Sequence, residues 1–533
     1  MALVDLGQGR GRAKVVSELG DPGVAADVIA AMLEDREVRT GFSRRMEEEA
    51  AQATERAKSL DFDRRDLRDL ATFTVDPASA HDFDDAVSAE RTDRGVRLWI
   101  HIADVAAHVR PGDGLEKEAY RRANSTYVPG TVAPMLPHVL SSDACSLAPD
   151  RERLAVTSEI ELSEAGEPLS ASFYRSLIRS DVRLDYDGLD EIFAGRARPP
   201  ESIASPLALA RDAAATLASR RPRSSLEVET FEPEFRFEDG QVIGAHSVPQ
   251  TEAHRLIEHL MILTNERVAE LLERRRVPAL YRVHEQPDPD RIKWLIEQLA
   301  SLDIPTPALP DEISPQHAGD LAGEASRLVA REAERRGHGR EAYTSLVLRS
   351  LKPAHYTDRN LGHAGLGSSA YAHFTSPIRR YPDLVAHRAL LSAIGADEEP
   401  PRAEGLAEIG AHCSERERDA TRVERDADSV CASFLLQREL FERGPDTRFE
   451  GEVSGVVGAG AFVRFGGALA DVYEGFLPAR RIGGRERYEL DETETRLVGM
   501  RGGAAVRIGD PATVTVDRVD APRGRVDLLP SER

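Results

Sequence analysis

Hydrophobic and polar positions alternate with a period of two in several short stretches of the chain. This alternation predicts β-strands at 72–75 and 96–102, and a second group at 449–453, 461–465 and 512–516. The later group follows a Gly-Pro-Asp linker at 444–446, and Gly-rich turns separate its strands. Short strands with such turns indicate a small barrel, so the C-terminal part is expected to be a separate β-domain.

Apolar residues that recur every three or four positions predict helices in the rest of the chain. The clearest are at 25–33, 44–58, 255–274 and 404–440, and another is expected to begin at Ile378 and run to 391. Strands and helices are thus mixed before the linker. The expected fold class is α+β, with a central domain of mixed sheet and helices followed by a β-barrel.

Composition narrows the class of protein. The 533 residues leave room for about three domains, and 41% of them are hydrophobic. We see no run of about 18 apolar residues and no N-terminal signal-like segment, so neither a membrane span nor secretion is expected. Three well-separated cysteines, Cys145, Cys413 and Cys431, suit a reducing cytoplasm. The net charge of −22 argues against a nucleic-acid ligand, unless a local arginine-rich channel lies inside an acidic exterior.

Four carboxylates gather in the ten residues that follow the first predicted strand: Asp76, Asp82, Asp84 and Asp85. Such charges repel one another unless a cation joins them, and Mg²⁺ prefers oxygen ligands. A calcium loop is disfavoured, because Ala86 and Val87 stand where an oxygen ligand and a glycine are needed. A solvated acidic turn is the alternative for this cluster taken alone. The cluster suits a metal site for phosphodiester cleavage.

A second group of polar side chains lies about 290 residues downstream, in 371–383. It contains His373, Thr375, Ser376, Arg379 and Arg380 around a proline. The two arginines are expected in the first turn of the helix that begins at Ile378, where the helix dipole disfavours cations. Such a local conflict is typical of functional positions, and a guanidinium matches phosphate oxygens. An ordinary surface pair of arginines is the alternative.

Together these segments resemble the ribonuclease II/ribonuclease R family, whose catalytic module is the RNB domain. Further matching stretches are 124–130, 134–137, 140–147, 178–186, 256–258 and 281–285. The resemblance implies an RNB domain at 61–443 and an RNA-binding OB-fold of the S1 type at 447–530. It also implies processive 3′-to-5′ hydrolysis of single-stranded RNA to nucleoside 5′-monophosphates and a short end product, with Mg²⁺ as cofactor and Mn²⁺ as the alternative metal.

The resemblance also implies roles for individual residues. Asp76, Asp82, Asp84 and Asp85 would hold the metal, with Asp84 the least dispensable, and Arg379 would stabilise charge on the scissile phosphate. The residues that would contact RNA are Tyr127, Tyr186, Glu258, His373, Thr375, Ser376 and Arg380, with Phe462, Arg464 and Tyr488 in the barrel. Glu258 is the candidate contact to the 2′-hydroxyl. Many family members have a second glutamate where this chain has His259.

The first 60 residues are expected to hold only a remnant of the cold-shock-type barrels found in the family. Residues 11–20 resemble the last strand of such a barrel, and connecting helices follow, so we expect a weaker grip on long or structured RNA. A monomer is expected. Two other functions stay open: an RNA-binding protein with a weak or inactive site on the same fold, and a phosphoryl-transfer enzyme that acts on nucleotides or DNA.

Overall fold

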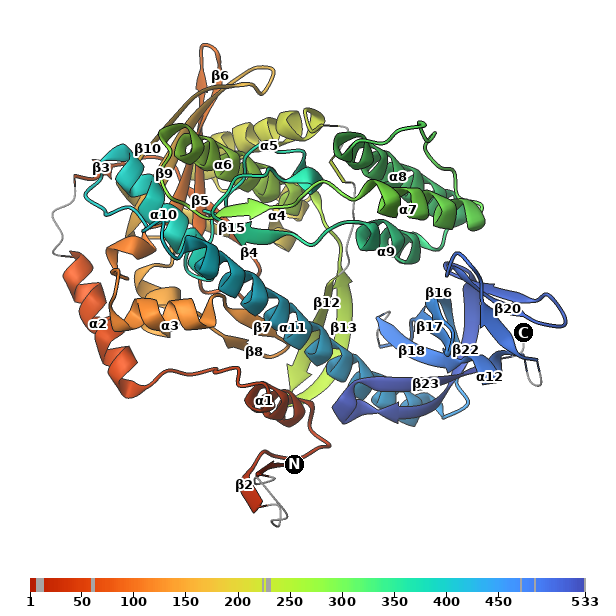
Figure 1. Ribbon diagram of the computed structural model, residues 1–533. Coiled ribbons are helices and arrows are strands. Elements are labelled where there is room, and N and C mark those ends of the chain that lie inside the picture. Colours follow the sequence, from red (N-terminus) through yellow and green to blue (C-terminus); the bar gives the residue numbers. More distant parts are fainter. Residues whose placement is uncertain are drawn as a thin grey trace.

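The computed structural model describes residues 1–5, 14–58, 63–222, 225–226, 232–469, 472–483 and 486–531. A large body built on one sheet occupies one side, and a group of three helices and a barrel occupy the other (Figure 1). Helix α11 (Leu406–Arg443) runs diagonally from the sheet body to the barrel and joins the two. Among the described residues, no helix combines the length and apolar character needed to cross a membrane.

The large body is built on a seven-stranded sheet of order β11-β4-β5-β6-β9-β10-β3. Its centre is antiparallel, whereas the two edge strands pair in parallel. The predicted strands at 72–75 and 96–102 are β4 and β6 of this sheet. The bounds are β3 (Arg65–Asp66), β4 (Phe73–Asp76), β5 (Asp85–Thr92), β6 (Gly95–Ala103), β9 (Glu152–Ser163), β10 (Pro168–Arg179) and β11 (Val182–Asp185).

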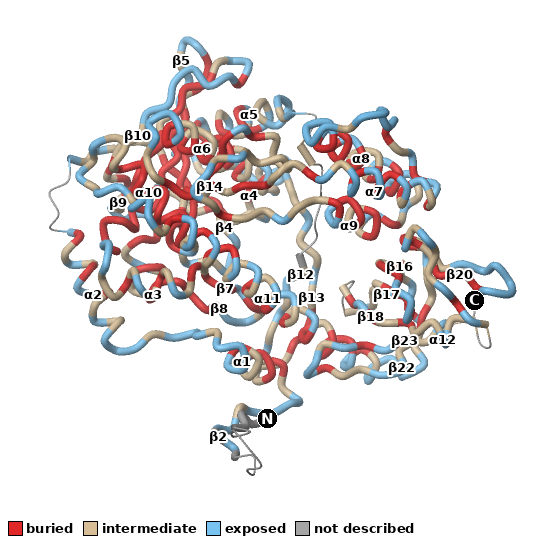
Figure 2. Tube along the Cα trace, viewed as in Figure 1, coloured by how far each residue is buried: buried red, intermediate tan, exposed pale blue. Residues whose placement is uncertain are grey.

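Helices bury the sheet in one continuous apolar core. Helix α5 (Ala204–Ser219) packs on β5, α6 (Glu252–Arg275) on β6 and α10 (Tyr381–Ile394) on β10. Figure 2 shows buried residues gathered in the interior of this body. Three shorter elements complete the body near the site: α3 (Gly114–Arg122), α4 (Tyr186–Phe193) and the hairpin of β7 (Thr126–Val128) and β8 (Thr131–Ala133).

The N-terminal segment packs on the outside of the body, whose apolar core includes Ala50 and Ala53. Strands β1 (Ala2–Asp5) and β2 (Lys14–Glu18) form a separate two-stranded sheet. The strand expected at 11–20 is represented by β2, and 11–13 lie outside the described residues. Helices α1 (Ala25–Asp35) and α2 (Arg44–Lys58) follow at the predicted positions, and α1 packs against α11.

The C-terminal strands close into a barrel of order β16-β17-β18-β23-β22. The three strands predicted in this region are β16, β17 and β22. The bounds are β16 (Phe449–Val457), β17 (Gly460–Phe465), β18 (Tyr473–Pro478), β22 (Pro511–Asp520) and β23 (Arg525–Pro530), with α12 (Ala479–Ile482) after β18. A three-stranded sheet of β19 (Tyr488–Leu490), β20 (Arg496–Gly499) and β21 (Ala505–Arg507) extends from it.

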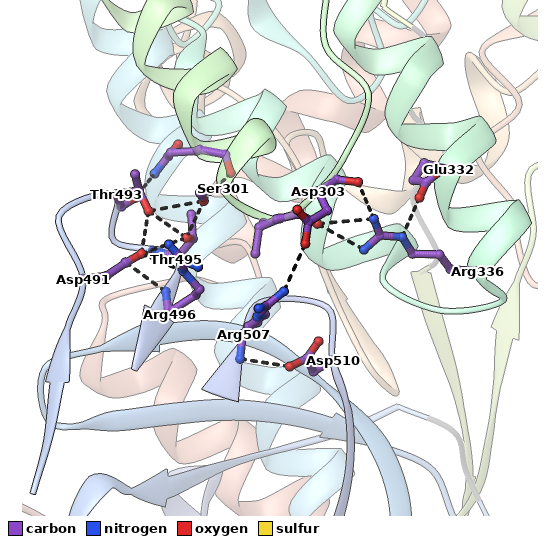
Figure 3. Close-up of polar contacts among 12 residues, drawn as sticks. Ser301, Asp303, Glu332, Arg336, Asp491, Thr493, Thr495, Arg496, Arg507 and Asp510 are labelled. Atoms are coloured by element: carbon purple, nitrogen blue, oxygen red, sulfur yellow. Dashed lines mark hydrogen bonds and ion pairs between the residues drawn. The ribbon is translucent and has the colours of Figure 1, made fainter. Parts of the chain in front are cut away.

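The barrel is fastened to the sheet body through the three-helix group of α7 (Pro289–Ser301), α8 (Pro315–Arg336) and α9 (Arg340–Ser350). One apolar cluster contains residues of the helices and of the barrel, including Leu295 and Val453. Figure 3 shows the polar edge of this contact: the Ser301 hydroxyl lies 2.8 Å from the Thr495 hydroxyl, and Arg507 lies 3.2 Å from Asp303. A shared core of this kind fixes the position of the barrel.

Two further pairs of antiparallel strands lie between these parts. Strands β12 (Glu232–Glu238) and β13 (Gln241–Val248) form a ribbon beside α11, visible in Figure 1. Strands β14 (Tyr281–Val283) and β15 (His355–Thr357) pair where the chain leaves the sheet body for the three helices and returns from them. Both strand pairs contribute to the surroundings of the site described next.

Candidate active site

The acidic cluster lies where two neighbouring strands of the large sheet end. Asp76 is the last residue of β4 and Asp85 is the first of β5, and the loop that joins these antiparallel strands carries Asp82 and Asp84. Parallel pairing of β11 with β4 sets Asp185 opposite Asp76. The next residue of the chain, Tyr186, therefore comes to lie at the same edge of the sheet as the aspartates.

The local environment resists the negative charge of these aspartates. Burial, together with the neighbouring Asp85 charge, raises the pKa of Asp76 to about 8. Burial also raises the pKa of Asp85 and of Asp84 above the usual carboxyl range. The Oδ2 atom of Asp76 is buried and has no hydrogen-bond partner among the described residues. Crowded, partly unpartnered carboxylates of this kind are typical of a site that binds a cation.

Asp84 connects the acidic cluster to the distant arginine segment. Its Oδ1 accepts a hydrogen bond of 2.9 Å from the backbone N–H of Ile378, and its Oδ2 lies 3.4 Å from Nε of Arg379. Asp84 is almost fully buried, whereas the Arg379 side chain is 48% exposed. The two groups, which lie about 290 residues apart in the sequence, therefore meet through this one carboxylate.

One expectation about the arginines is wrong. Helix α10 begins at Tyr381, so Arg379 and Arg380 lie in the turn before it and not in its first helical turn. The cause is pairing with a remote segment: the N–H of Ser125 donates to the carbonyl of Arg379, and the N–H of Tyr381 donates to that of Ala123. This pairing holds Arg380 in an extended conformation, which a helix cannot contain.

Two buried residues that sequence reasoning missed hold this loop in place. Asp383, with no exposed surface, accepts from the backbone N–H of Ser376 at 2.8 Å and from Nε and Nη2 of Arg380 at 2.9 and 2.7 Å. Asn265 accepts from the N–H of Phe374 and donates to the hydroxyl of Tyr371. Each is a polar residue on the mostly apolar buried face of a helix, and that was their signal in the sequence.

A cavity of about 2170 Å³ opens over the four aspartates and over residues 374–380, the arginine loop, which carries Arg379 and Arg380. With the exception of Tyr488, every residue predicted from the sequence to bind metal, act in catalysis or contact RNA lines this cavity. Tyr488 instead lies buried in the apolar cluster between the barrel and the three helices, so its expected RNA contact is corrected. The predicted residues that line the cavity are Asp76, Asp82, Asp84, Asp85, Tyr127, Tyr186, Glu258, His373, Thr375, Ser376, Arg379, Arg380, Phe462 and Arg464.

The side walls of the cavity carry the tyrosines and Glu258. The Tyr127 hydroxyl donates to Asp82 at 3.0 Å. One face of Tyr186 is stacked on the His254 ring, with centroids 3.9 Å apart and planes 10° apart. Glu258 accepts from the amide of Gln250 at 2.6 Å, and burial raises its pKa. These contacts hold the side chains in defined positions against the cavity.

The outer wall comes from the barrel. Phe462 and Arg464 are on the same face of β17, and Phe462 packs against Phe476 of β18 with ring centroids 5.2 Å apart. Arg464 forms an ion pair with Glu341 of α9. The barrel therefore presents an aromatic surface and a guanidinium to the cavity, as single-strand-binding barrels do.

Among the described residues, no three His, Cys, Asp or Glu side chains form a set able to hold a metal ion by themselves. Mg²⁺, however, is usually held by one or two carboxylates and completes its shell with waters and substrate phosphates. The crowded pair of Asp76 and Asp85, with the unpartnered oxygen of Asp76, fits that requirement. These residues therefore fit a divalent cation that binds together with a phosphodiester.

Comparison with known families agrees with this architecture. The RNB domain matches residues 64–396, and the S1 RNA binding domain matches residues 443–529. The mixed sheet body, the C-terminal barrel and the acidic site together define a nuclease of the RNB class. Nucleases of this class are metal-dependent hydrolases.

Comparison with individual proteins identifies the family. The chain is 34% identical to Ribonuclease R of Aquifex aeolicus over 97% of its own length and 72% of that protein. It is 34% identical to Ribonuclease R of Escherichia coli over 98% of its length, but spans 64% of that relative. The apo RNase R structure from Mycoplasma genitalium superposes with a TM-score of 0.85 at 26% identity, covering 97% of this chain and 80% of that one. The chain belongs to the ribonuclease II/ribonuclease R family of 3′-to-5′ exoribonucleases.

Proposed function

We propose that this chain degrades single-stranded RNA processively from the 3′ end to nucleoside 5′-monophosphates and a short end product, with Mg²⁺ as its metal and Mn²⁺ as a substitute. The observation that carries the proposal is the meeting of the acidic cluster and the arginine loop through Asp84 at one cavity. The structure of Mycoplasma genitalium RNase R in complex with ribose methylated single-stranded RNA supports the choice of substrate.

The residues at this end of the cavity suit cleavage of a phosphodiester. The half-exposed Arg379 is available to the scissile phosphate while Asp84 holds its Nε side. Asp82, Asp84 and the pair of Asp76 and Asp85 are proposed to hold the cation and orient the attacking water. When bound there, a divalent cation would neutralise charge on the phosphate and activate the water.

Aromatic rings account for recognition without sequence preference. The cavity side of Tyr186, stacked on His254, is proposed to receive the last base, and Tyr127 and Phe462 to contact bases further along the strand. Every base has a face that can stack, at about 1–3 kcal/mol per base. Glu258 is proposed to accept from a 2′-hydroxyl, and Thr375, Ser376, His373, Arg380 and Arg464 to contact the backbone.

A fold of this kind does not by itself guarantee activity. The structure of yeast Ssd1, described as a pseudonuclease, superposes with a TM-score of 0.67 at 18% identity, which is a likeness of fold alone. In this chain all four aspartates and Arg379 are present and face one cavity. This favours an active enzyme over a binding protein. We further propose a monomer that works in the cytoplasm, where its three buried free cysteines would stay reduced.

A gel time course tests the proposal. The substrates are a 5′-labelled single-stranded RNA, the matched DNA and an RNA with a duplexed 3′ end, each with Mg²⁺ or with EDTA. Wild type is compared with Asp84→Asn and with Asp311→Asn, a control at an exposed aspartate. We expect shortening of the single-stranded RNA to a few nucleotides with Mg²⁺ in wild type and the control only.

Three outcomes would contradict the proposal. RNA that is bound but stays intact in every condition would indicate an RNA-binding protein on a catalytic scaffold. Equal digestion of the DNA would indicate a nuclease that does not distinguish the sugar. A cleavage pattern that starts within the strand would exclude attack from the 3′ end.

A further inference from the structure

A buried tyrosine contacts the histidine that stands at the cavity beside the arginine loop. The hydroxyl of Tyr356, in β15, lies 2.8 Å from Nδ1 of His373. Only 4% of Tyr356 is exposed, and its ring is held by the guanidinium of Arg282 at 4.7 Å. Arg282 in turn pairs with Glu417 of α11 at 2.7 Å. Tyr356 is therefore a fixed partner for one side of the imidazole.

The surroundings of His373 oppose a positive charge on its imidazole. Burial lowers its pKa well below the usual histidine range, and the positive charges of Arg380 and Arg282 lower it further. A neutral imidazole has one nitrogen that donates a hydrogen bond and one that accepts. Which nitrogen donates is set by the partner of the other.

The hydroxyl of Tyr356 determines which of the two neutral tautomers of His373 is favoured. Burial raises its pKa, so the hydroxyl keeps its proton. Within the described part of the chain, Nδ1 of His373 is the acceptor in reach of that proton. If Nδ1 carried the hydrogen, the tyrosine proton would lose its hydrogen bond to His373, which costs free energy in a buried position. The favoured arrangement has Tyr356 donating to Nδ1, with the hydrogen of His373 on Nε2.

We propose that Tyr356 is a positioning residue that fixes His373 as a neutral hydrogen-bond donor, with its Nε2–H directed to a phosphate or ribose oxygen of the RNA backbone. His373 lines the main cavity with Thr375, Ser376 and Arg380, so an oxygen of the bound strand is the acceptor within its reach. A neutral donor binds a backbone oxygen without adding a charge next to the two arginines. This inference rests on the proposed function in one respect: that the strand bound in the cavity is RNA.

The tautomer of His373 can be measured by NMR, without any assay of catalysis. In protein labelled with ¹⁵N-histidine, the resonances of His373 are assigned by their loss in His373→Gln. We expect a pyridine-like shift at Nδ1 and a pyrrole-like shift at Nε2 at neutral pH, and a mixture of forms in Tyr356→Phe. A pyrrole-like Nδ1 or a charged ring in wild type, or an unchanged pattern in Tyr356→Phe, would overturn the proposal. The wild-type spectrum decides even if Tyr356→Phe does not fold.

Binding of RNA supplies the second readout. Loss of one hydrogen bond is expected to raise Kd for a single-stranded RNA about three- to tenfold in Tyr356→Phe. In the His373→Gln background, the glutamine amide donates whether or not Tyr356 has its hydroxyl, so the added Tyr356→Phe change should cost nothing further. An equal cost in both backgrounds would show that Tyr356 acts by some route other than His373. Binding without cleavage would refute the proposed function and leave this inference standing.

Discussion

At the scale of single residues, the most consequential feature is the crowding of carboxylates around Asp76. Because the folded pKa of Asp76 is raised, the folded protein binds this proton more tightly than the unfolded chain, and the free energy of unfolding falls as the pH rises from about 4 through about 8. In EDTA at pH 8, we therefore expect Asp76→Asn to stabilise the protein by about 1 kcal/mol, seen as a Tm raised by about 1 °C in a chain of this length.

Measurements at a second pH and with added Mg²⁺ provide controls for the same substitution. At pH 5 the wild-type carboxyl is already protonated for the most part, so the difference in Tm between wild type and Asp76→Asn should shrink. Added Mg²⁺ should raise the Tm of wild type but not that of the variant, because ligands that bind the folded state stabilise it. A Tm of Asp76→Asn below that of wild type at pH 8 in EDTA would contradict the role of charge crowding.

At the scale of elements, the loop between Phe374 and α10 depends on Asp383. Removal of its charge leaves the guanidinium of Arg380, whose side chain is 24% exposed, beside a neutral amide, and breaking a largely buried pair costs up to about 3–5 kcal/mol. We expect Asp383→Asn to lower the free energy of unfolding by about this amount in urea titrations, and to weaken RNA cleavage more than Asp311→Asn, which changes an exposed carboxyl. Wild-type stability in Asp383→Asn would show that Ser376 and Arg380 do not need this partner.

The elements also show what the sequence could and could not predict. Helices α2, α6 and α11 and strands β4, β6, β16 and β17 lie close to their predicted positions, because a long or regular apolar pattern encodes them locally. The predicted start of α10 was wrong, because pairing with residues 123–125 and the Asp383 clamp set it. The contribution of Asn265 was missed for the same reason: its partners are more than 100 residues away.

At the scale of the whole molecule, the position of the barrel determines how much of the strand the cavity can hold. Besides the apolar cluster and the contacts of Figure 3, the barrel is anchored to α11: Glu439, fully buried, accepts from the N–H of Ala468 at 2.8 Å and from the Tyr473 hydroxyl at 3.0 Å. Two attachments, one on α11 and one on the three helices, hold the barrel wall beside the cavity. The binding of long RNA should therefore depend on this attachment of the barrel, whereas the binding of a strand too short to reach the barrel should not.

Gly509 offers a way to disturb the docking at one point. It has φ of +85°, and a Cβ there would lie 2.2–2.4 Å from the ring of Tyr343 in α9. We expect Gly509→Ala to raise Kd about tenfold for an RNA of about 20 nucleotides, a length that includes the roughly 4–16 nucleotides an OB-fold covers, and to leave cleavage of about five nucleotides unchanged. Gly503→Ala is the matched control, because Gly503 also has a positive φ, +67°, but no neighbour within 4 Å. It carries the same backbone strain without the clash, so it should bind both RNAs as wild type does. An equal loss of affinity for the long RNA in the two variants would contradict this prediction. It would mean that backbone strain, and not the attachment of the barrel to α9, determines the affinity.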